Sequence, residues 1–533
     1  MRSIKILDCT LRDGGYVNDW NFGLGTIESI VSRLNKAGID IVEIGFLDGR
    51  RKYDENRSIL PDTDSIKPIF KNLDINDAMI LAMIDFGTCG IDNISNCKDS
   101  VIDGIRVIFK KKNCIEALRF CAAIKEKGYK IFLQPVSVTG YTDSEMTALI
   151  KQANEIGPYG IYIVDTYGLM HKKEMMHYFH LMDDNLAEEI SIGYHSHNNF
   201  QLAYANCTEL MAVESNRELI VDGSLYGMGK SAGNACTELL ALHINEYYGG
   251  QYIIDQILEA IDVDIMKEYA KQYWGYSLQH FMAAAQDCHP DYVNSLLSKR
   301  TLSVKSINEI IAKIEPQDKL VFNREIVETL YRNYQNNIID DSDAYTRLGS
   351  ELSKRDILVI APGKSIEVHA ESINSFIHRN EPLIITINFI NDDYQPDYVF
   401  MGNAKRYSQF FNKIYRKDLN PKVICTSNVS ESNKKIDYRF NFNSLIIADE
   451  LIRDNPVLML IKILVKMKFS KVFIAGFDGY VADDNQNYPE EYIQFLFCND
   501  NVVLRNEAVK KVLAETGKDI ELNFITPSLY LHS

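Results

Sequence analysis

The stretch ILDCTLRDGGY, residues 6–16, places an arginine beside an aspartate directly after an apolar, strand-like run. Arg12 is a cation that could stabilise negative charge on a reacting oxygen, and Asp13 carries a carboxylate that could bind a metal ion. Two glycines and Tyr16 follow. A salt bridge within the pair would also explain it, so other segments must decide between a structural pair and a site.

A second stretch, YHSHNN at residues 194–199, places two histidines at alternate positions near the end of another apolar run. Alternate side chains of a strand point to the same side, so His195 and His197 can offer ring nitrogens to one ion. Two imidazoles with carboxylate and water oxygens suit Mn²⁺, Mg²⁺, Zn²⁺ or Fe²⁺. The alternative is a hydrogen-bonded pair of histidines. Together with Asp13, the pattern favours a divalent metal site.

Eight apolar runs alternate with helical patterns in the first half of the chain, and they must position these residues. The runs span residues 4–10, 40–46, 78–85, 104–109, 130–138, 160–166, 190–197 and 218–224. The alternation predicts a parallel (β/α)8 TIM barrel over residues 1–250, with a doubly wound sheet as the alternative. In such a barrel the active site lies at the carboxyl ends of the strands.

Polar side chains gather at those carboxyl ends, and a glycine-rich turn, YGMGKSAGN at 226–234, follows the last run. Glycines let backbone N–H groups approach a ligand, and a helix N-terminus favours anions. The ring at the strand ends includes Asp85, Arg106, Lys110, Ser137 and Asp222. The residues that we expect to contact a substrate are Thr10, Gln134, Asp165, Thr166, Gly227 and Gly229.

Three motifs now resemble a known family. They are D-x-T-L-R-D-G at residues 8–14, H-x-H at 195–197, and G-x-G-x-x-x-G-N at 227–234. In this order they resemble the metal-dependent, HMG-CoA lyase-like TIM barrels. That family includes 4-hydroxy-2-oxovalerate aldolase, HMG-CoA lyase, and the isopropylmalate and homocitrate synthases. The resemblance covers about residues 1–245 and is closest to 4-hydroxy-2-oxovalerate aldolase.

The resemblance implies a role for each matching residue. Asp13, His195 and His197 would hold the divalent ion, most simply Mn²⁺ or Mg²⁺, and Asn234 matches a further ligand of some members. Arg12 would stabilise the enolate oxygen that forms when a carbon–carbon bond next to a carbonyl is cleaved or made. Glu43 would orient Arg12.

The sequence departs from the family at the proton acceptor. Tyr16 stands where the 4-hydroxy-2-oxo-acid aldolases have a histidine base, and Phe46 stands where a second histidine would fall. The loop GMGKSAG also lacks the cysteine that HMG-CoA lyase uses there. The candidates for the base are therefore Tyr16, Tyr276, His280 or a metal-bound water.

The remainder of the chain predicts two further parts. Residues 251–350 read as a helical appendage, and residues 354–533 read as a Rossmann-like open α/β domain with strands that include 383–388 and 444–449. This domain weakly resembles sialyltransferase-like and pterin-pyrophosphokinase-like nucleotide-binding domains found with bacterial surface-polysaccharide genes. A nucleotide or nucleotide sugar would bind at its strand ends and at the turn after its first strand. The candidate residues are Pro362, Gly363, Lys364, Ser365, Asn388, Asn403 and Asp478.

The composition limits the partners and the compartment. A net charge of −16 over 533 residues argues against nucleic acid or an anionic membrane as the main partner. We expect no signal peptide and no membrane span. Ten scattered cysteines without a CxxC pair are typical of free thiols in a reducing cytoplasm. Barrels of this kind often form homodimers or higher homo-oligomers.

The leading hypothesis is a divalent-metal-dependent carbon–carbon lyase or aldolase acting on a 2-oxo acid through a pyruvate-enolate type of chemistry. Its context would be bacterial surface-glycan or nucleotide-sugar metabolism. The alternatives are a Claisen-type acyl transferase that uses an acyl-CoA, a bifunctional enzyme whose C-terminal domain is a glycosyltransferase, and a degenerate barrel that serves as a scaffold.

Overall fold

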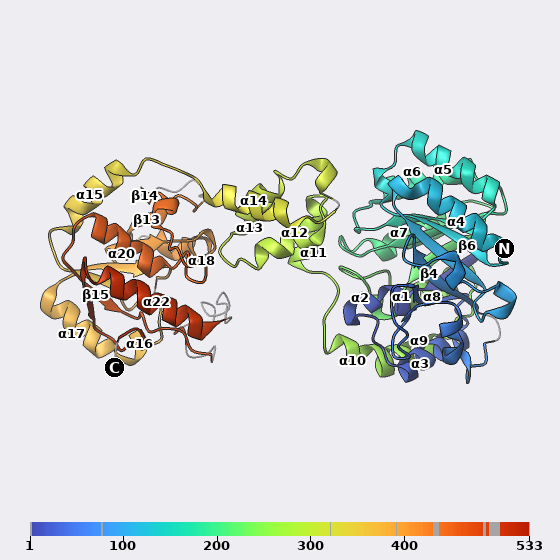
Figure 1. Cartoon of the computed structure of the whole chain (residues 1–533), viewed down its shortest axis with the longest axis horizontal. Helices are drawn as coiled ribbons and strands as arrows, with labels where there is room; N and C mark the ends of the chain where they lie inside the picture. The colour runs from blue at the N-terminus through green and yellow to red at the C-terminus, as the bar shows by residue number, and fades with distance from the viewer. Residues whose placement is uncertain are drawn as a thin grey trace. The chain divides into compact units, whose positions relative to one another are not determined.

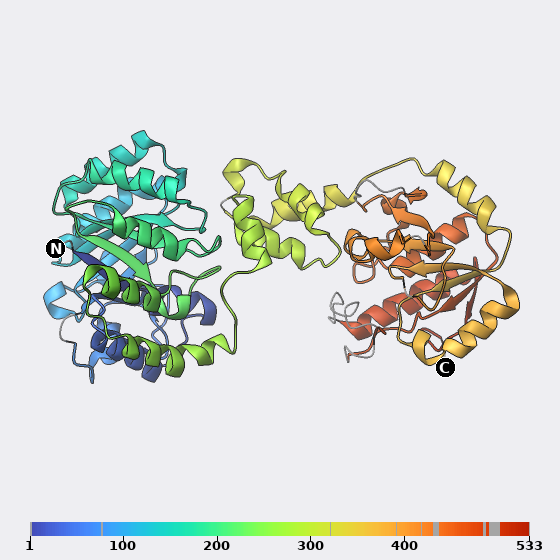
Figure 2. The same cartoon turned by 180° about the vertical axis from the view of Figure 1, so that it is seen from behind.

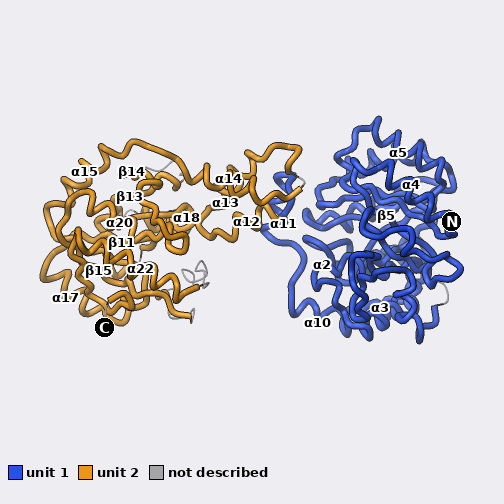
Figure 3. The backbone as a smooth tube through the Cα atoms, in the orientation of Figure 1, with its two compact units in different colours: residues 1–290 blue, residues 291–533 orange. Residues whose placement is uncertain are grey.

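A computed structural model describes residues 3–75, 78–319, 321–390, 392–416, 418–429, 436–482, 487–489 and 501–531. The chain divides into two compact units, Met1–Pro290 and Asp291–Ser533, which Figure 3 colours separately. Each unit has a hydrophobic core of its own. The division falls inside the segment 251–350, and the three-part division expected from the sequence stays a prediction.

Unit 1 is built on a parallel sheet that closes on itself. The closing strand β1 pairs with β9 on one side, where Leu7 lies opposite Asp222, and with β2 on the other, where Leu7 lies opposite Ile41. A two-residue strand, β3 (Ile59–Leu60), extends β2 at its edge. The barrel strands are β1 (Ile4–Asp8), β2 (Ile41–Leu47), β4 (Met79–Asp85), β5 (Gly104–Phe109), β6 (Lys130–Pro135), β7 (Gly160–Asp165), β8 (Ser191–Ser196) and β9 (Leu219–Gly223). The predicted TIM barrel is confirmed.

Helices surround these strands on the outside, as Figure 1 shows. The long ones are α3 (Leu24–Lys36), α4 (Cys114–Glu126), α5 (Asp143–Ile156), α6 (Lys172–Asp183), α7 (Ala203–Ala212) and α8 (Thr237–Tyr248). Local signals set their limits. Helix α5 begins with a capping box between Thr142 and Glu145 and ends at Gly157, whose φ of 60° only glycine adopts without strain. The connection from β2 to β4 instead uses a 3-10 helix, η1 (Asp64–Phe70).

Short helices complete unit 1 at both ends of its chain. Two single turns, α1 (Thr10–Asp13) and α2 (Gly15–Asn18), follow β1 directly. After the barrel come α9 (Ile254–Ala260), α10 (Met266–Tyr269) and α11 (Leu278–Ala285). Among the helices of the described residues, none has the length and apolar character needed to cross a bilayer.

Unit 2 contains a second parallel sheet, with strand order β14-β13-β12-β11-β10-β15-β16. Its strands are β10 (Ile357–Ile360), β11 (Leu383–Ile387), β12 (Tyr398–Met401), β13 (Lys422–Thr426), β14 (Tyr438–Phe440), β15 (Lys471–Ala475) and β16 (Glu521–Phe524). The helices are α12 (Pro290–Leu297), α13 (Val304–Ile311), α14 (Arg324–Gln335), α15 (Ser342–Leu352), α16 (Ser365–Val368), α17 (Ala370–Asn380), α18 (Ala404–Ile414), α19 (Phe442–Leu445), α20 (Pro456–Lys466) and α22 (Val502–Thr516). The predicted open α/β architecture is confirmed.

Helices cover both faces of this sheet (Figure 2), because successive residues of each buried strand point to opposite sides. Ile357 and Val359 of β10 pack in the cluster that includes α15, α20 and α22. Leu358 and Ile360 pack in the cluster formed with α16, α17 and α18. The carboxyl edge of the sheet, between these helix layers, is where strand-end residues meet.

One predicted strand of unit 2 is wrong. Residues 444–449 form no strand: they contain the end of the single turn α19, which Asn441 begins by accepting a hydrogen bond from the Asn443 N–H at 3.3 Å. The apolar run is explained by packing, because Leu445 and Ile447 are buried in the same cluster as α20. The short strand β14, just before this turn, pairs with β13 instead.

Candidate active site

The turn α1 holds Arg12 and Asp13 over the carboxyl end of the barrel. Asp8, the last residue of β1, fixes this turn from below. Its carboxylate accepts hydrogen bonds from the Thr10 N–H at 2.9 Å and from the Thr237 hydroxyl at 2.6 Å. The turn is therefore tied through Asp8 to helix α8, which follows the last strand.

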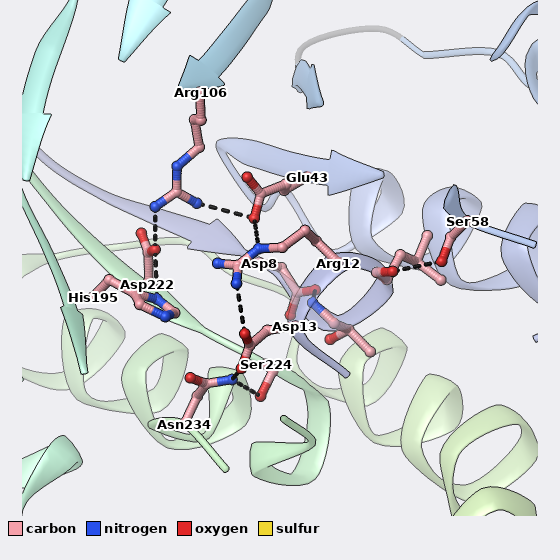
Figure 4. A network of polar contacts seen from close by, with 12 residues as sticks. Asp8, Arg12, Asp13, Glu43, Ser58, Arg106, His195, Asp222, Ser224 and Asn234 are labelled. Atoms are coloured by element: carbon pink, nitrogen blue, oxygen red, sulfur yellow. Dashed lines mark hydrogen bonds and ion pairs between the residues drawn. The ribbon is translucent and has the colours of Figure 1, made fainter. Parts of the chain in front are cut away.

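A chain of alternating charges crosses the barrel beneath the site (Figure 4). The Arg12 Nε donates to Glu43 Oε2 at 2.7 Å, and Arg106 Nη1 donates to the same oxygen at 3.1 Å. Arg106 also donates through Nη2 to Asp222 Oδ2 at 2.5 Å, and Arg12 donates through Nη1 to Asp13 Oδ1 at 2.5 Å. All five side chains are buried. Each charge is compensated by its neighbours, as buried ions require.

The two histidines extend this chain to the barrel mouth. His195 Nδ1 lies 2.9 Å from Asp222 Oδ2, and His197 Nδ1 lies 3.2 Å from the Gly233 carbonyl oxygen. Both partners can only accept, so each Nδ1 carries the proton and donates it. In the neutral form of such a ring Nε2 carries the lone pair, and this is the form of histidine that binds metals.

Asp13, His195 and His197 converge on one point. One ligand atom from each lies within 4.8 Å of the others, so a single ion could contact all three. A second group, Cys9 with His195 and Asp222, meets the same criterion. Burial raises the pKa of the Cys9 thiol well above its usual range, and Asp222 is already paired. The group that contains Asp13 is therefore the better metal site.

The protonation states suit a cation. Burial alone would raise the pKa of Asp13, but Arg12 and the two histidines outweigh burial and hold that pKa well below its usual range. Burial lowers the pKa of His197 to about 4. At neutral pH the site thus offers an ionised carboxylate and a neutral imidazole, as metal ligands must be.

Several buried polar atoms around this point have no hydrogen-bond partner among the described residues. They include Asn234 Oδ1, Arg12 Nη2 and Glu43 Oε1. Buried polar atoms in folded proteins are nearly always paired, so such a group of unpaired atoms indicates a surface that faces a ligand. The Asn234 amide nitrogen donates to Asp13 Oδ2 at 2.8 Å, which places its free oxygen beside the metal group. These residues fit a divalent ion.

The glycine-rich turn after β9 packs tightly against this group. A Cβ at Gly229 would lie 2.3 Å from Asn234 Nδ2 and 2.5 Å from Asp13 Oδ2, so only glycine fits. Gly227 has a φ of 62°, which also favours glycine. The Lys230 N–H donates to Asp13 Oδ2 at 3.1 Å. The turn therefore supplies backbone contact to the site as well as the Asn234 side chain.

Comparisons with known families and sequences identify relatives of this chain. A family model described as HMGL-like matches residues 3–263. The 4-hydroxy-2-oxovalerate aldolase of Roseiflexus castenholzii is 30% identical over 251 residues, which cover 45% of this chain and 70% of that protein. The chain belongs to the HMGL-like family. It is accordingly an enzyme of the lyase and aldolase type.

Other known proteins match with lower identity. The oxaloacetate decarboxylase of Mycobacterium tuberculosis is 23% identical over 304 residues, which cover 53% of this chain and 86% of that protein. Among solved structures, the HMG-CoA lyase of Bacillus subtilis matches with 17% identity and a TM-score of 0.41, covering 50% of this chain and 93% of that one.

The departures from the HMGL-like pattern lie at the barrel mouth. Tyr16 is partly exposed, and its ring packs edge-on against Trp20 with centroids 4.8 Å apart. Burial raises the pKa of the Tyr16 hydroxyl to about 12, so it keeps its proton at neutral pH. Lys230 Nζ lies 5.4 Å from the centre of the same ring. Lys230 was not among the site residues predicted from the sequence.

Other residues predicted for this HMGL-like site make contacts within the barrel. The Thr10 hydroxyl accepts from the Leu225 N–H at 2.8 Å, and Thr166 Oγ1 accepts from the Ser137 N–H at 2.9 Å. With its amide oxygen turned toward Arg106, Gln134 accepts from that guanidinium. These side chains support the mouth, and their contact with a substrate stays a prediction.

Asp165 and the two residues near α11 complete the predicted set. The Asp165 carboxylate accepts from the N–H groups of Leu169 and Met170, and burial raises its pKa to about 7. Tyr276 is exposed, and His280 Nδ1 lies 3.0 Å from the Ser277 hydroxyl. Within the described part of the chain, neither Tyr276 nor His280 has a hydrogen bond to the charged chain at the mouth.

Proposed function

We propose that the barrel is a divalent-metal-dependent lyase that cleaves, or in reverse forms, a carbon–carbon bond beside the carbonyl group of a 2-oxo acid. The observation that carries this proposal is the convergence of Asp13, His195 and His197 within 4.8 Å, next to the unpaired Arg12 Nη2. A metal group and a free guanidinium N–H at one point are what a developing enolate requires.

Each residue then has a part in the reaction. Asp13, His195 and His197, with the Asn234 oxygen, would hold Mn²⁺ or Mg²⁺, which supplies Lewis-acid polarisation of the substrate oxygens when bound. Arg12 is held by Glu43 and would donate through Nη2 to the oxygen on which negative charge develops.

The side chains at the barrel mouth determine which proton transfers are possible. Because the Tyr16 hydroxyl stays protonated at neutral pH, it can donate a proton to a departing group but is a poor acceptor. The positive charge of Lys230 lies on the same side of the mouth. It would attract the anionic substrates of a 2-oxo acid lyase.

The named relatives suggest two reactions. One relative is a 4-hydroxy-2-oxovalerate aldolase and another is an oxaloacetate decarboxylase. Both names describe the loss of a group from the carbon beside a 2-oxo carbonyl, so both substrates belong in the test. The broader context proposed from the sequence is surface-glycan or nucleotide-sugar metabolism in the cytoplasm by a homo-oligomer. A nucleotide site in unit 2 would support that context.

The test measures pyruvate release by the full-length chain, loaded with Mn²⁺ or Mg²⁺, from a series of 4-hydroxy-2-oxo acids and from oxaloacetate. His197→Ala should lose bound metal and lower kcat/KM by about 10²- to 10³-fold. His177→Ala is the matched control, because His177 lies on the surface and pairs with Asp143. Full activity of His197→Ala, or the absence of metal binding by the wild type, would contradict the proposal. Release of CoA from an acyl-CoA in the presence of a 2-oxo acid would favour the acyl transferase instead.

A further inference from the structure

A cavity of about 270 Å³ opens at the carboxyl edge of the sheet in unit 2. The ends of β10, β11, β12 and β15 contribute Gly363, Asn388, Asn403 and Asp478 to its lining. The chain runs outward from β10 to β14 on one side and continues through β15 and β16 on the other. The cavity therefore lies where the strand order reverses, which is the place where open α/β sheets bind ligands.

The cations that line this cavity are Lys299, Arg300, Arg406 and Arg505, and the sequence analysis considered none of them. Arg406 lies in the first turn of α18 and is 8% exposed, and Arg505 lies on α22. The Arg406 guanidinium lies 5.7 Å from the ring centre of Tyr488. Burial raises the pKa of Tyr480 and of Tyr488, and both arginines act against that shift, so their charges converge on these two hydroxyls.

Two helices begin at the cavity, and each is eleven residues long. Asn403 caps α18 by accepting from the Arg406 N–H at 2.8 Å, and Asn455 caps α20 by accepting from the N–H groups of Val457 and Leu458, each at 3.1 Å. The amino ends of helices carry partial positive charge and favour anions. They reinforce the two arginines at the same edge.

The loops after β10 and β15 approach each other closely at the floor of the cavity. The Gly363 N–H donates to the Gly476 carbonyl at 2.8 Å, and a Cβ at Gly363 would lie 2.3 Å from that oxygen. The Asp478 carboxylate accepts from both the N–H and the hydroxyl of Ser365. The absence of a side chain at Gly363 thus lets the two loops lie close together at this side of the cavity.

Aromatic and acidic side chains also line the cavity. The rings are those of Phe477, Tyr480, Tyr488 and Tyr530, and the carboxylates are those of Glu450, Asp454 and Asp478. Aromatic faces stack on nucleobases, carboxylates accept hydrogen bonds from sugar hydroxyls, and arginines bind phosphate. A single small molecule with all three groups matches this lining.

We propose that the cavity binds a nucleoside phosphate, with its phosphate against Arg406 and the amino ends of α18 and α20, and its base against the tyrosine rings. The volume is at the lower end of small-molecule sites, so a mononucleotide unit fits better than a dinucleotide. This inference deepens the nucleotide part of the proposed function and uses residues of unit 2 alone.

The test is calorimetric titration of the full-length chain with AMP, CMP, GMP, UMP and inorganic phosphate. At least one nucleotide should bind with a stoichiometry of one and at least tenfold more tightly than phosphate. Arg406→Gln and Arg505→Gln should each weaken that binding about tenfold, as expected for loss of one charged hydrogen bond. Arg347→Gln is the matched control, because Arg347 lies on the exposed face of α15 in the same unit and pairs with Asp343.

Arg505→Gln keeps the proposal testable if the more buried Arg406→Gln fails to fold. The proposal is overturned if none of the four nucleotides binds at millimolar concentration, or if both variants bind as the wild type does. Equal affinity for inorganic phosphate would overturn the nucleoside assignment. Because no barrel substrate is present, failure of pyruvate release would leave this result unaffected.

Discussion

The barrel mouth and the cavity of unit 2 both lie at the carboxyl ends of parallel strands, yet they hold their charges in different ways. In the barrel, Arg106 bridges Glu43 and Asp222 by direct ion pairs. In the cavity, Arg406 lies against the Tyr488 ring and beside a capped helix end. The first arrangement fixes each side chain through its neighbours. The second places positive charge in the lining of the cavity for which we propose a ligand.

This difference predicts which substitutions weaken folding and which weaken ligand binding. Removing a member of the charged chain leaves buried ions without partners, so the fold itself should weaken. Removing a cation of the cavity should weaken binding more than folding. Both tryptophans of the chain, Trp20 and Trp274, lie in unit 1. Tryptophan fluorescence therefore reports on the barrel alone and can separate the two cases.

The largest expected effect is that of Arg106→Met. Arg106 is fully buried, and its loss leaves both Glu43 and Asp222 without that cation. We expect the free energy of unfolding of the barrel to fall by about 3–5 kcal/mol. Urea unfolding followed by tryptophan fluorescence measures it. Arg217, a buried arginine that bonds mainly to backbone carbonyls, offers a comparison variant, Arg217→Met. An unfolding midpoint of Arg106→Met equal to that of the wild type would contradict the inference that the ion pairs of Arg106 stabilise the barrel.

A smaller effect of opposite sign, a gain in stability relative to the wild type, is expected for Asp8→Asn. Asp8 has hydroxyl and N–H partners, and burial, the largest influence, raises its pKa from 3.8 to about 6. A pKa that is higher in the folded state costs stability as the pH rises from about 4 through 6. The stability of Asp8→Asn relative to the wild type should therefore increase between pH 4 and pH 8, by up to about 3 kcal/mol.

The control for Asp8 is a carboxylate that is shifted in the other direction. Hydrogen bonds from Arg50 lower the pKa of Asp48. Asp48→Asn should therefore lose stability relative to the wild type as the pH rises through the acid range. Unfolding of Asp8→Asn at pH 4 and pH 8, and of Asp48→Asn at about pH 2 and pH 5, followed by tryptophan fluorescence, measures the two slopes. Slopes of the same sign would contradict the assignment of the Asp8 shift to burial.

The smallest effect is expected for Lys230→Gln. Among the described residues no ion pair involves Lys230, whose Nζ lies 5.4 Å from the centre of the Tyr16 ring at the barrel mouth. If the substrate is a 2-oxo acid anion, we expect KM to rise roughly tenfold, equivalent to about 1.4 kcal/mol, with kcat changed less. The difference in KM between the variant and the wild type should become smaller at high salt, because salt screens the charge of Lys230. Lys172→Gln, which breaks the surface pair with Glu209, is the control. A fall in kcat at constant KM would instead place Lys230 in the chemical step.

Sequence patterns predicted the barrel well because its strands are continuous apolar runs with polar ends. All eight runs became strands, and the alternation predicted closure. The same reasoning was wrong at 444–449, where an apolar run packs as a turn against α20. The strand β16, with the sequence ELNF, was missed because it is short and mostly polar at an edge of the sheet.

The two sites also differ in how many of their residues could be recognised from the sequence. Asp13, His195 and His197 were recognisable because the chemistry lies in short motifs. The linking role of Arg106 was not, because its partner Asp222 is 116 residues away and only closure of the barrel brings them together. Arg406 and Arg505 lie on helices with no local motif. Their meeting depends on how helices pack at the strand ends, which residue spacing does not encode.

The close contact at Gly229 has a consequence for how this chain can vary. Since a methyl group there would displace both Asp13 and Asn234, any lineage that keeps this acid–amide pair has no neutral single-step change at position 229. A larger residue would fit there only after Asp13 or Asn234 had been replaced by a smaller side chain, and that replacement would remove a candidate metal ligand. A larger residue at position 229 of a related chain would therefore indicate that the acid–amide pair has changed, independently of any substrate preference.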